Sequence, residues 1–244
     1  MVITSLSNNK VKQLVKYHDK KYRELDQVFL VEGEHLIKEA LNANVLLEVI
    51  IVENTSIDIN FDNITYVNEE VMKKISFTKS SYNIIGMCRY MDTKVSIDYN
   101  KVIILDDLQD PGNIGTIIRS ACSFGFDCVI ISNRGVDLYN DKLIRSTQGA
   151  IFNIPVIQTS LVDEISKLKK SNVEIIATDL HQSYSLNEYK VSEKFALVMG
   201  NEGSGVSEEI LNLADVRVKI PMKNFESLNV AVAAGICMFK LGGL

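Results

Sequence analysis

Short runs of apolar, mostly β-branched residues alternate along this chain with segments whose apolar positions recur every three or four residues. The short runs are typical of buried strands, and the second spacing is typical of amphipathic helices. Beyond residue 100 the pattern predicts strands at 102–105, 128–132, 174–178, 195–199 and 216–220, with helices at 113–124, 141–147, 161–170, 206–213 and 228–241. Strands that alternate with helices in this way predict a parallel sheet covered on both faces.

The first 90 residues predict a smaller α/β unit. Its expected strands are 27–31, 46–52, 63–67 and 83–89, and its expected helices are 8–25, 32–42 and 68–75. Residues 91–100 show no sustained period and are interpreted as a linker. The pattern therefore predicts two domains, one at 1–90 and a larger one at 101–244.

Composition narrows the class of protein. The 244 residues are 46% hydrophobic and 23% charged, which is ordinary for a globular protein with a sizeable core. No apolar run reaches the ~18–20 residues of a membrane span, and the polar start at 1–10 predicts no secretory signal. Four scattered cysteines without a CxxC pair favour free thiols in a reducing compartment, so we expect a cytoplasmic protein. Three scattered histidines predict no metal site.

Charge is unevenly distributed along the chain. The net charge of −5 counts against a general nucleic-acid binder, yet residues 1–24 hold six basic residues against two acidic ones. A local charge of +4 on a helix could attract phosphates, and Lys10, Lys12 and Lys16 are the candidates for RNA contacts. A helix face that is merely solvated remains the alternative.

Three polar loops follow predicted strands, at the carboxyl ends where ligands bind on parallel sheets. After 102–105 come Asp110, Pro111, Gly112 and Asn113, which are residues that start helices. That role does not account for Arg119, which lies amid small and apolar residues of the following helix and is expected to face a cleft.

The second loop, at 200–205, has three glycines in six residues, so its backbone can pass close to a ligand. It matches neither GxGxxG nor a Walker loop, and Glu202 within it would repel a phosphate, so a neutral or cationic ligand suits it better. A plain glycine-rich turn with Ser207 as an N-cap is the alternative. The third segment, 220–229, leads into an apolar helix that Glu226 or Ser227 is expected to open. Its Asn229 needs a hydrogen-bond partner.

These three segments resemble the motifs of a known family. Residues 110–121, 198–206, and 220–222 with 226–233 are similar, in order and spacing, to those of the SpoU/TrmH family of RNA 2′-O-ribose methyltransferases. The resemblance covers about 101–244. The N-terminal part is more loosely similar to the family's small substrate-binding domain, which resembles ribosomal RNA-binding proteins. Thr116 stands where alanine is common, and Ala231 where serine is common.

The resemblance implies a fold, a cofactor and a partner. It implies a C-terminal domain tied in a deep trefoil knot, which breaks the rule that chains do not thread loops. It further implies S-adenosylmethionine as methyl donor and a homodimer with the active site near the subunit interface. The implied catalytic residues are Arg119, Asn113, Glu202 and Asn229, and the implied cofactor-binding residues are Gly200, Ile220, Met222 and Leu228. Thr178 is a further cofactor-binding candidate because it ends another predicted strand.

The chemistry constrains the role of the arginine. A ribose hydroxyl is a poor nucleophile, whereas a sulfonium methyl is already activated, so catalysis needs in-line positioning and help with one proton. Arginine has a pKa above ~12 and rarely deprotonates. We therefore expect Arg119 to bind the target's phosphate and stabilise the developing alkoxide, with the proton leaving through the phosphate or a water.

Other functions remain open at this point. A base methyltransferase of the same knotted superfamily is disfavoured by Arg119 and the segment 227–229. A catalytically silent RNA-binding or ribosome-assembly factor is disfavoured by the presence of Arg119, Glu202 and Asn229 together. A Rossmann-type enzyme is disfavoured because no GxGxxG follows the first strand of the larger domain. Ribosomal RNA is the expected substrate, with transfer RNA and a role in antibiotic resistance left open.

Overall fold

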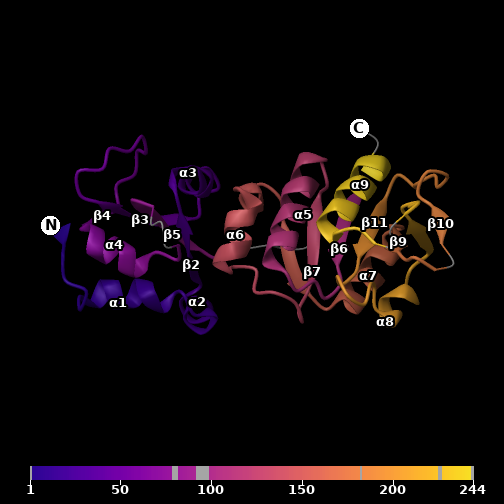
Figure 1. Ribbon diagram of the computed structural model, residues 1–244, viewed down its shortest axis with the longest axis horizontal. Helices are drawn as coiled ribbons and strands as arrows, with labels where there is room; N and C mark the ends of the chain where they lie inside the picture. The colour runs from indigo at the N-terminus through magenta and orange to yellow at the C-terminus, as the bar shows by residue number, and fades with distance from the viewer. Residues whose placement is uncertain (1, 79–81, 92–98, 182, 225–226, 243–244) are drawn as a thin grey trace. The chain divides into compact units, whose positions relative to one another are not determined.

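The computed structural model describes residues 2–78, 82–91, 99–181, 183–224 and 227–242 (Figure 1). The chain forms two compact units. Unit 1 comprises Met1–Asp92 and Tyr139–Phe152, and unit 2 comprises Thr93–Leu138 and Asn153–Leu244. Of the expected linker at 91–100, residues 92–98 lie outside the described part of the chain.

Unit 1 is built on a five-stranded mixed sheet with the order β1-β4-β3-β5-β2. Strand β5 runs antiparallel to β2 and β3, while β4 runs parallel to β1 and β3. The strands are β1 Val2–Ile3, β2 Val28–Glu32, β3 Leu46–Val52, β4 Ile64–Val67 and β5 Ile84–Arg89, and the first helices are α1 Asn9–Lys16, α2 Lys20–Asp26, α3 Glu34–Asn42 and α4 Glu69–Ile75. The expected α/β character of this part is confirmed.

The single helix predicted at 8–25 is wrong, because the chain breaks it into α1 and α2. Asp19 has extended backbone angles, and its carboxylate accepts the N–H of Lys21 at 2.9 Å, so it starts a new helix. The carbonyl of Tyr17, at the end of α1, accepts a hydrogen bond from the buried guanidinium of Arg23 at 2.6 Å. Apolar spacing continues across the break, which is why periodicity alone did not reveal it.

Unit 1 also contains a segment from the middle of the sequence. Helix α6 (Asp141–Thr147) and the 3₁₀ turn Ala150–Phe152 belong to it. The ring of Tyr139 stacks on Tyr90 with centroids 3.8 Å apart and lies 4.6 Å from Phe29. The chain therefore passes between the two units three times, whereas the sequence pattern predicted one crossing. Contacts between aromatic rings so far apart in sequence leave no local periodic signal.

Unit 2 is a seven-stranded sheet with the order β10-β12-β9-β11-β6-β7-β8, and every neighbouring pair is parallel. The predicted parallel sheet is thus confirmed. Its strands are β6 Lys101–Leu105, β7 Cys128–Ser132, β8 Val156–Thr159, β9 Glu174–Thr178, β10 Tyr184–Ser185, β11 Phe195–Met199 and β12 Val216–Lys219. The sequence pattern missed the short strands β1, β8 and β10.

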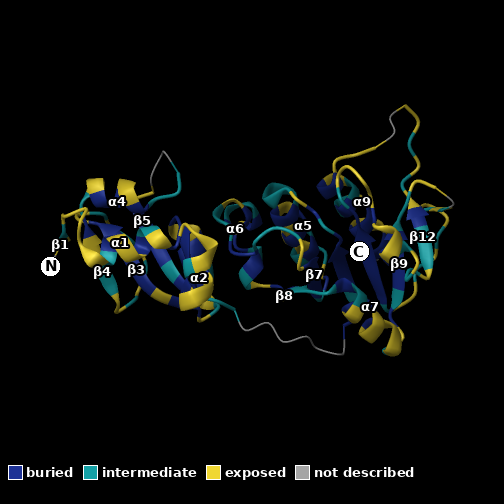
Figure 2. Cartoon of the chain, turned by 90° about the horizontal axis from the view of Figure 1, so that it is seen from below, coloured by how far each residue is buried: buried dark blue, intermediate teal, exposed yellow. Residues whose placement is uncertain are grey.

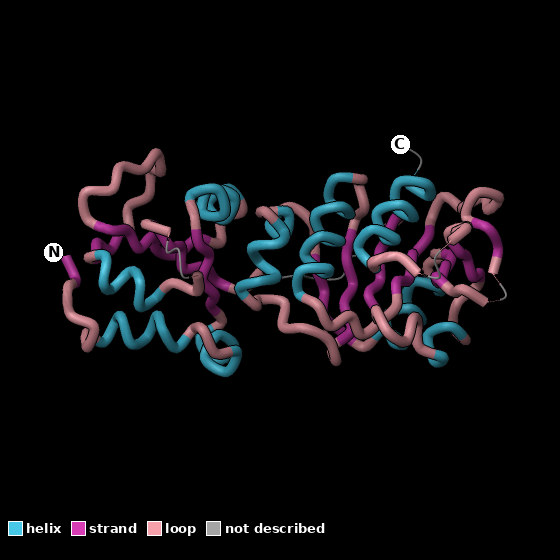
Figure 3. The backbone as a smooth tube through the Cα atoms, in the orientation of Figure 1, coloured by secondary structure: helices cyan, strands magenta, loops and turns pink. Residues whose placement is uncertain are grey.

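Helices cover both faces of this sheet. Helices α5 (Pro111–Ser123) and α9 (Val230–Gly242) pack together on one face, and α7 (Leu161–Lys170) and α8 (Glu208–Leu211) lie on the other (Figures 1 and 3). Strands β7 and β11 are buried throughout, and dark blue strands mark this interior in Figure 2. Among the described residues, no helix is both long and apolar enough to cross a membrane.

One of the predicted RNA-binding lysines is engaged inside unit 1. The ammonium of Lys10 lies 2.5 Å from a carboxylate oxygen of Glu48, whose side chain is only 4% exposed. The other carboxylate oxygen of Glu48 accepts a hydrogen bond from the hydroxyl of Thr65 at 2.6 Å. Lys12 and Lys16, in contrast, are exposed. Lys10 therefore neutralises a buried acid and helps to hold α1 against the sheet.

Replacing Lys10 with alanine is expected to lower the free energy of unfolding by about 1–3 kcal/mol, because the buried Glu48 carboxylate loses its charged partner. The exposed Lys12→Ala variant is the matched control and should change this quantity by less than about 0.5 kcal/mol. Urea denaturation followed by circular dichroism measures both. Equal stability of the two variants would contradict a structural role for Lys10.

Candidate functional site

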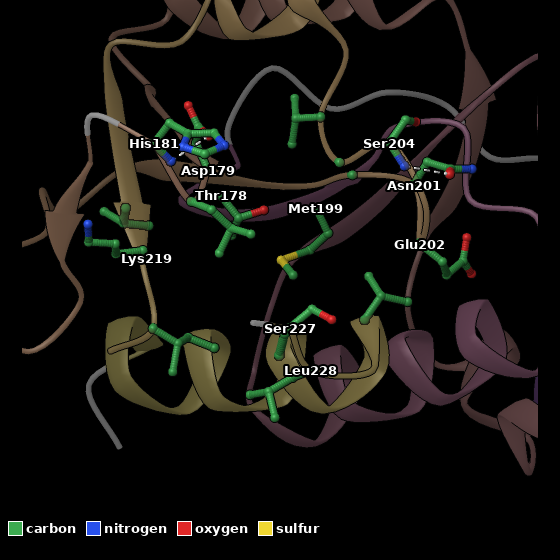
Figure 4. A pocket seen from close by; sticks show the side chains of 18 of the residues that line it. Thr178, Asp179, His181, Met199, Asn201, Glu202, Ser204, Lys219, Ser227 and Leu228 are labelled. Carbon is green, nitrogen blue, oxygen red and sulfur yellow. Dashed lines mark hydrogen bonds between the residues drawn. The ribbon is translucent and has the colours of Figure 1, made fainter. Parts of the chain in front are cut away.

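A pocket of about 490 Å³ opens at the carboxyl ends of β9, β11 and β12 (Figure 4). Its walls come from the loops that follow these strands and from the start of α9. All five residues predicted to bind the cofactor line it, namely Thr178, Gly200, Ile220, Met222 and Leu228. The third motif reaches the pocket on either side of residues 225–226, which lie outside the described chain, as does the expected helix start at Glu226.

The loop after β11 is shaped by its own hydrogen bonds. Asn201 and Gly205 exchange two backbone hydrogen bonds of 2.9 Å, and the side-chain oxygen of Asn201 accepts the N–H of Gly203 at 2.9 Å. The loop folds back so closely that a Cβ on Gly200 would lie 2.0 Å from the backbone nitrogen of Val206. No side chain fits there, so glycine is required at position 200 for the loop to close.

Asn113 connects the three motif segments. Its side-chain nitrogen donates to Glu202 Oε1 at 3.0 Å, and its side-chain oxygen accepts from Asn229 Nδ2 at 3.0 Å. The oxygen of Asn229 in turn accepts the N–H groups of Ala231 and Val232, at 3.0 and 3.3 Å. Asn229 therefore caps α9, and this accounts for a polar amide at the start of an apolar helix.

The carboxylate of Glu202 stays ionised at neutral pH. Partial burial raises its pKa. Hydrogen bonds from the Asn113 side chain and from the backbone N–H groups of Glu202, Gln109 and Asp110 together lower the pKa by more than burial raises it, so the pKa falls below its ordinary value. Any stability from these bonds is therefore present above the ordinary carboxyl pKa and is lost as the pH falls through the lowered one. The pocket thus carries a fixed negative charge, which suits a cationic ligand.

Arg119 lies outside the hydrogen-bonded cluster that joins the other three predicted catalytic residues. It lies on α5 beyond Asn113, its side chain is exposed, and, like Asn113 and Asn229, it is not part of the pocket wall. Among the described residues no hydrogen bond or ion pair engages its guanidinium. The partner of Glu202 is Asn113 and not Arg119. Arg119 is therefore available to a ligand that approaches from solvent.

Sequence reasoning missed part of the pocket wall. Asp179, Leu180 and His181 follow β9 and line the pocket, and Lys219 at the end of β12 does so as well. The carboxylate of Asp179 accepts a hydrogen bond from Arg217 at 3.2 Å. The carboxyl-end rule that suggested Thr178 would also have found these residues, had it been applied to the whole loop. No group of three or more potential metal ligands occurs among the residues that the structure describes.

The model of the SpoU rRNA methylase family matches residues 100–239, more than half of the chain. This chain belongs to that family. Residues 8–86 of this SpoU methylase also match the MRM3-like substrate binding domain.

Relatives of this SpoU methylase extend over its whole length. It is 36% identical over 246 residues to the 23S rRNA (guanosine(2553)-2′-O)-methyltransferase RlmP of Bacillus subtilis, with 99% of both chains covered. A crystal structure of an RNA 2′-O ribose methyltransferase matches with a TM-score of 0.85 and 27% identity, covering 98% of this chain and 97% of the other. The AdoMet-bound rRNA methyltransferase of Sinorhizobium meliloti matches with a TM-score of 0.87 and 27% identity, covering 98% and 96%.

These findings bear directly on the function predicted from sequence. The family model, a full-length relative and two full-length structural matches agree with one another. The expectation of an RNA 2′-O-ribose methyltransferase that uses S-adenosylmethionine is confirmed at this level.

Substituting Gly200 by alanine is expected to weaken S-adenosylmethionine binding at least roughly tenfold, because the loop must open by ångströms to admit the methyl group. Gly203→Ala is the matched control in the same loop, since a Cβ there meets only the Asn201 side chain at 3.6 Å. Isothermal calorimetry with the cofactor measures both affinities. If Gly200→Ala binds like Gly203→Ala, the close approach of the loop does not shape the pocket.

Proposed function

We propose that this protein transfers the methyl group of S-adenosylmethionine to a ribose 2′-hydroxyl of large-subunit ribosomal RNA. The observation that carries the proposal is the full-length similarity to the Bacillus subtilis enzyme, whose name specifies 23S rRNA. A tRNA substrate has less support, because the Aquifex TrmH/SpoU tRNA-modifying structure covers only 59% of this chain, with a TM-score of 0.54. The match of residues 8–86 to the MRM3-like substrate binding domain also favours ribosomal RNA as the substrate.

The pocket fits the proposed cofactor. Its volume of about 490 Å³ lies within the usual range for small-molecule sites, and Met199, Val218 and Leu228 give it apolar walls. Glu202 adds a negative charge, which is complementary to a sulfonium. Gly200 lines the pocket and lets the loop close against it, because a Cβ there would collide with the loop's own backbone. The bound cofactor supplies an activated methyl group, and the protein positions it for transfer.

The remaining chemistry falls to the cluster around Asn113. We assign Asn113, Glu202 and Asn229 to holding the start of α5, the loop at 200–205 (the cofactor loop) and the start of α9 in one geometry, because hydrogen bonds of 3.0 Å join them. We assign to Arg119 the contact with the RNA. Its guanidinium binds a phosphate and stabilises the alkoxide that develops on the ribose oxygen. The hydroxyl proton leaves through that phosphate or a water.

The exposed basic residues of unit 1 are assigned to the RNA backbone. Lys12 and Lys16 on α1 are exposed, and Lys16 and Lys21 lie 5.2 and 5.9 Å from the ring of Tyr22. Together they form a basic surface beside an aromatic ring, which suits phosphates and sugars. Lys10 is left out of this surface because Glu48 already neutralises it.

A homodimer is the proposed assembly. Helix α9 exposes an apolar stripe at helical spacing, with Val232, Ile236 and Phe239 exposed by 52, 40 and 58%. Phe124, the residue after α5, extends it, with its ring centroid 6.0 Å from that of Phe239. Exposed apolar patches of this kind mark interaction sites. A second copy of the chain, packed on α9, would cover the stripe and lie beside the pocket. We further propose the knotted C-terminal topology of the resemblance and a cytoplasmic location.

Mapping of ribose methylation should identify the target. In 23S rRNA from cells that lack the gene, one 2′-O-methyl group is expected to be missing, and complementation with the wild-type gene should restore it. Mass mapping or primer extension at low nucleotide concentration measures this, with the transfer RNA pool from the same cells as control. A loss confined to transfer RNA would contradict the proposed substrate.

Replacing Arg119 with alanine should slow methyl transfer by ~10²–10³ while leaving cofactor affinity nearly unchanged, because a group that acts in the transition state affects turnover more than ground-state binding. Arg119→Lys should recover little, since an ammonium cannot form a planar bidentate contact. Single-turnover methylation of the RNA, beside calorimetric titration of the cofactor, tests both. Near wild-type turnover of Arg119→Ala would refute the assignment.

A further inference from the structure

The loop that follows β7 is held in place by Ser132, the residue that ends the strand. The hydroxyl of Ser132, the last residue of β7, donates a short hydrogen bond to the carboxylate of Asp107 and accepts the backbone N–H of Arg134 at 3.1 Å. The carbonyl of Ser132 accepts the N–H of Gly135 at 3.2 Å. The backbone around Arg134 is therefore fixed by both polar groups of one serine.

Two further contacts fix the far side of this loop. The side-chain amide of Gln158, on the neighbouring strand β8, donates to the carbonyls of Ser132 and Val136 at 3.2 and 3.1 Å. At Gly135 the loop passes the loop after β6 so closely that a Cβ would lie 3.3 Å from the carbonyl oxygen of Leu108. The segment 132–136 is thus a rigid turn packed on the loop that follows β6.

Asp107 links this turn to the cofactor loop at 200–205. Asp107, which bonds Ser132 through its side chain, has a left-handed backbone with φ of 52°. This conformation presents its carbonyl to the side-chain nitrogen of Asn201, which donates to it at 2.8 Å. The turn that carries Arg134 and the loop that shapes the pocket are therefore tied to one residue.

The arginine that this turn presents is exposed and unused by the protein. Unit 2 has three described arginines, Arg119, Arg134 and Arg217. Arg217 pairs with Asp179, whereas no hydrogen bond or ion pair engages the guanidinium of Arg119 or Arg134 among the residues described. A guanidinium on a fixed backbone loses less freedom on binding, and its planar donors match a phosphate.

Strand order places this arginine two strands from the one that leads to the pocket. Strand β7 lies beside β6, and β6 lies beside β11, which carries the cofactor loop. Two strand spacings separate β7 from β11, about 10 Å in all. That distance corresponds to about three nucleotides at a rise of ~3.4 Å along one strand. The turn therefore lies within reach of the nucleotides that flank the methylated one.

We propose that Arg134 binds a phosphate of the substrate RNA within a few nucleotides of the methylated ribose, and that Ser132 and Asp107 position it for this contact. The inference rests on the proposed RNA methyltransferase function. In this assignment Arg134 contributes to substrate affinity and register, and Arg119 acts at the reacting ribose.

The test is steady-state methylation of the cognate ribosomal RNA fragment by Arg134→Ala. The KM for RNA should rise about tenfold, and the slope of log KM against log salt should fall by about one unit, as expected for one lost phosphate contact. The kcat and the calorimetric affinity for S-adenosylmethionine should stay within about twofold of wild type, because Arg134 touches neither the pocket nor the hydrogen-bonded cluster.

Lys170→Ala is the matched control. Lys170 is exposed at the C-terminal end of α7, which leads into the amino end of β9. This is the opposite end of the strands from the pocket, which lies at their carboxyl ends. Its loss should leave the KM and the salt slope unchanged. Ser132→Ala keeps the charge but loosens the turn, so it should raise the KM less than Arg134→Ala and retain the wild-type salt slope.

The outcomes separate the two proposals. Unchanged KM and salt slope in Arg134→Ala would overturn the inference, as would a fall in kcat alone. An equal effect in Lys170→Ala would overturn it too, because any surface cation would then serve. If the wild-type protein binds the cofactor yet methylates no ribosomal RNA, the proposed function fails by itself, before any variant is compared.

Discussion

Two hydrogen bonds made by one asparagine side chain hold the site together. Asn113 donates to Glu202 and accepts from Asn229, and these three residues come from segments separated by about 90 and 27 residues. Each segment is fixed locally by its own cap or turn, and Asn113 bonds to both of the others, while a hydrogen bond from Asn201 to the carbonyl of Asp107 adds a second link between the first two. An amide is suited to this role because it offers a donor and an acceptor on the same rigid plane.

The consequences of this arrangement extend to the electrostatics of the pocket. The donors that fix Glu202 also stabilise its charged form, so the bond that builds the site keeps it anionic. The loop at 200–205, closed tightly behind Gly200, then presents that charge beside an apolar wall of the pocket. Geometry and charge are therefore not independent, and a change at Asn113 would alter both. Arg119 and Arg134 lie outside this cluster, and both are exposed.

The N-terminal unit depends on a different principle. Helix α6 and the contacts of Tyr139 with Tyr90 and Phe29 belong to this unit, although they follow two strands of the other unit in the sequence. Its basic α1 is anchored by a buried ion pair between Lys10 and Glu48, so one lysine stabilises the fold while its neighbours remain exposed. Local charge therefore overstated how many cations are available to RNA.

The sequence by itself determined the local features of this protein. Strands β7, β9 and β11 were predicted with the bounds observed, because runs of apolar residues bounded by polar loops have few other solutions. The sequence also predicted that Asn229 needs a hydrogen-bond partner and that the backbone of the loop at 200–205 can make close approaches. Tertiary structure alone decided which partners meet: that Asn229 finds Asn113, that Lys10 finds Glu48, and that Tyr139 stacks on Tyr90. The physical reason is that periodicity and capping depend on neighbours in sequence, whereas these contacts depend on how the strands are ordered in the sheets and on how the chain returns between the two units.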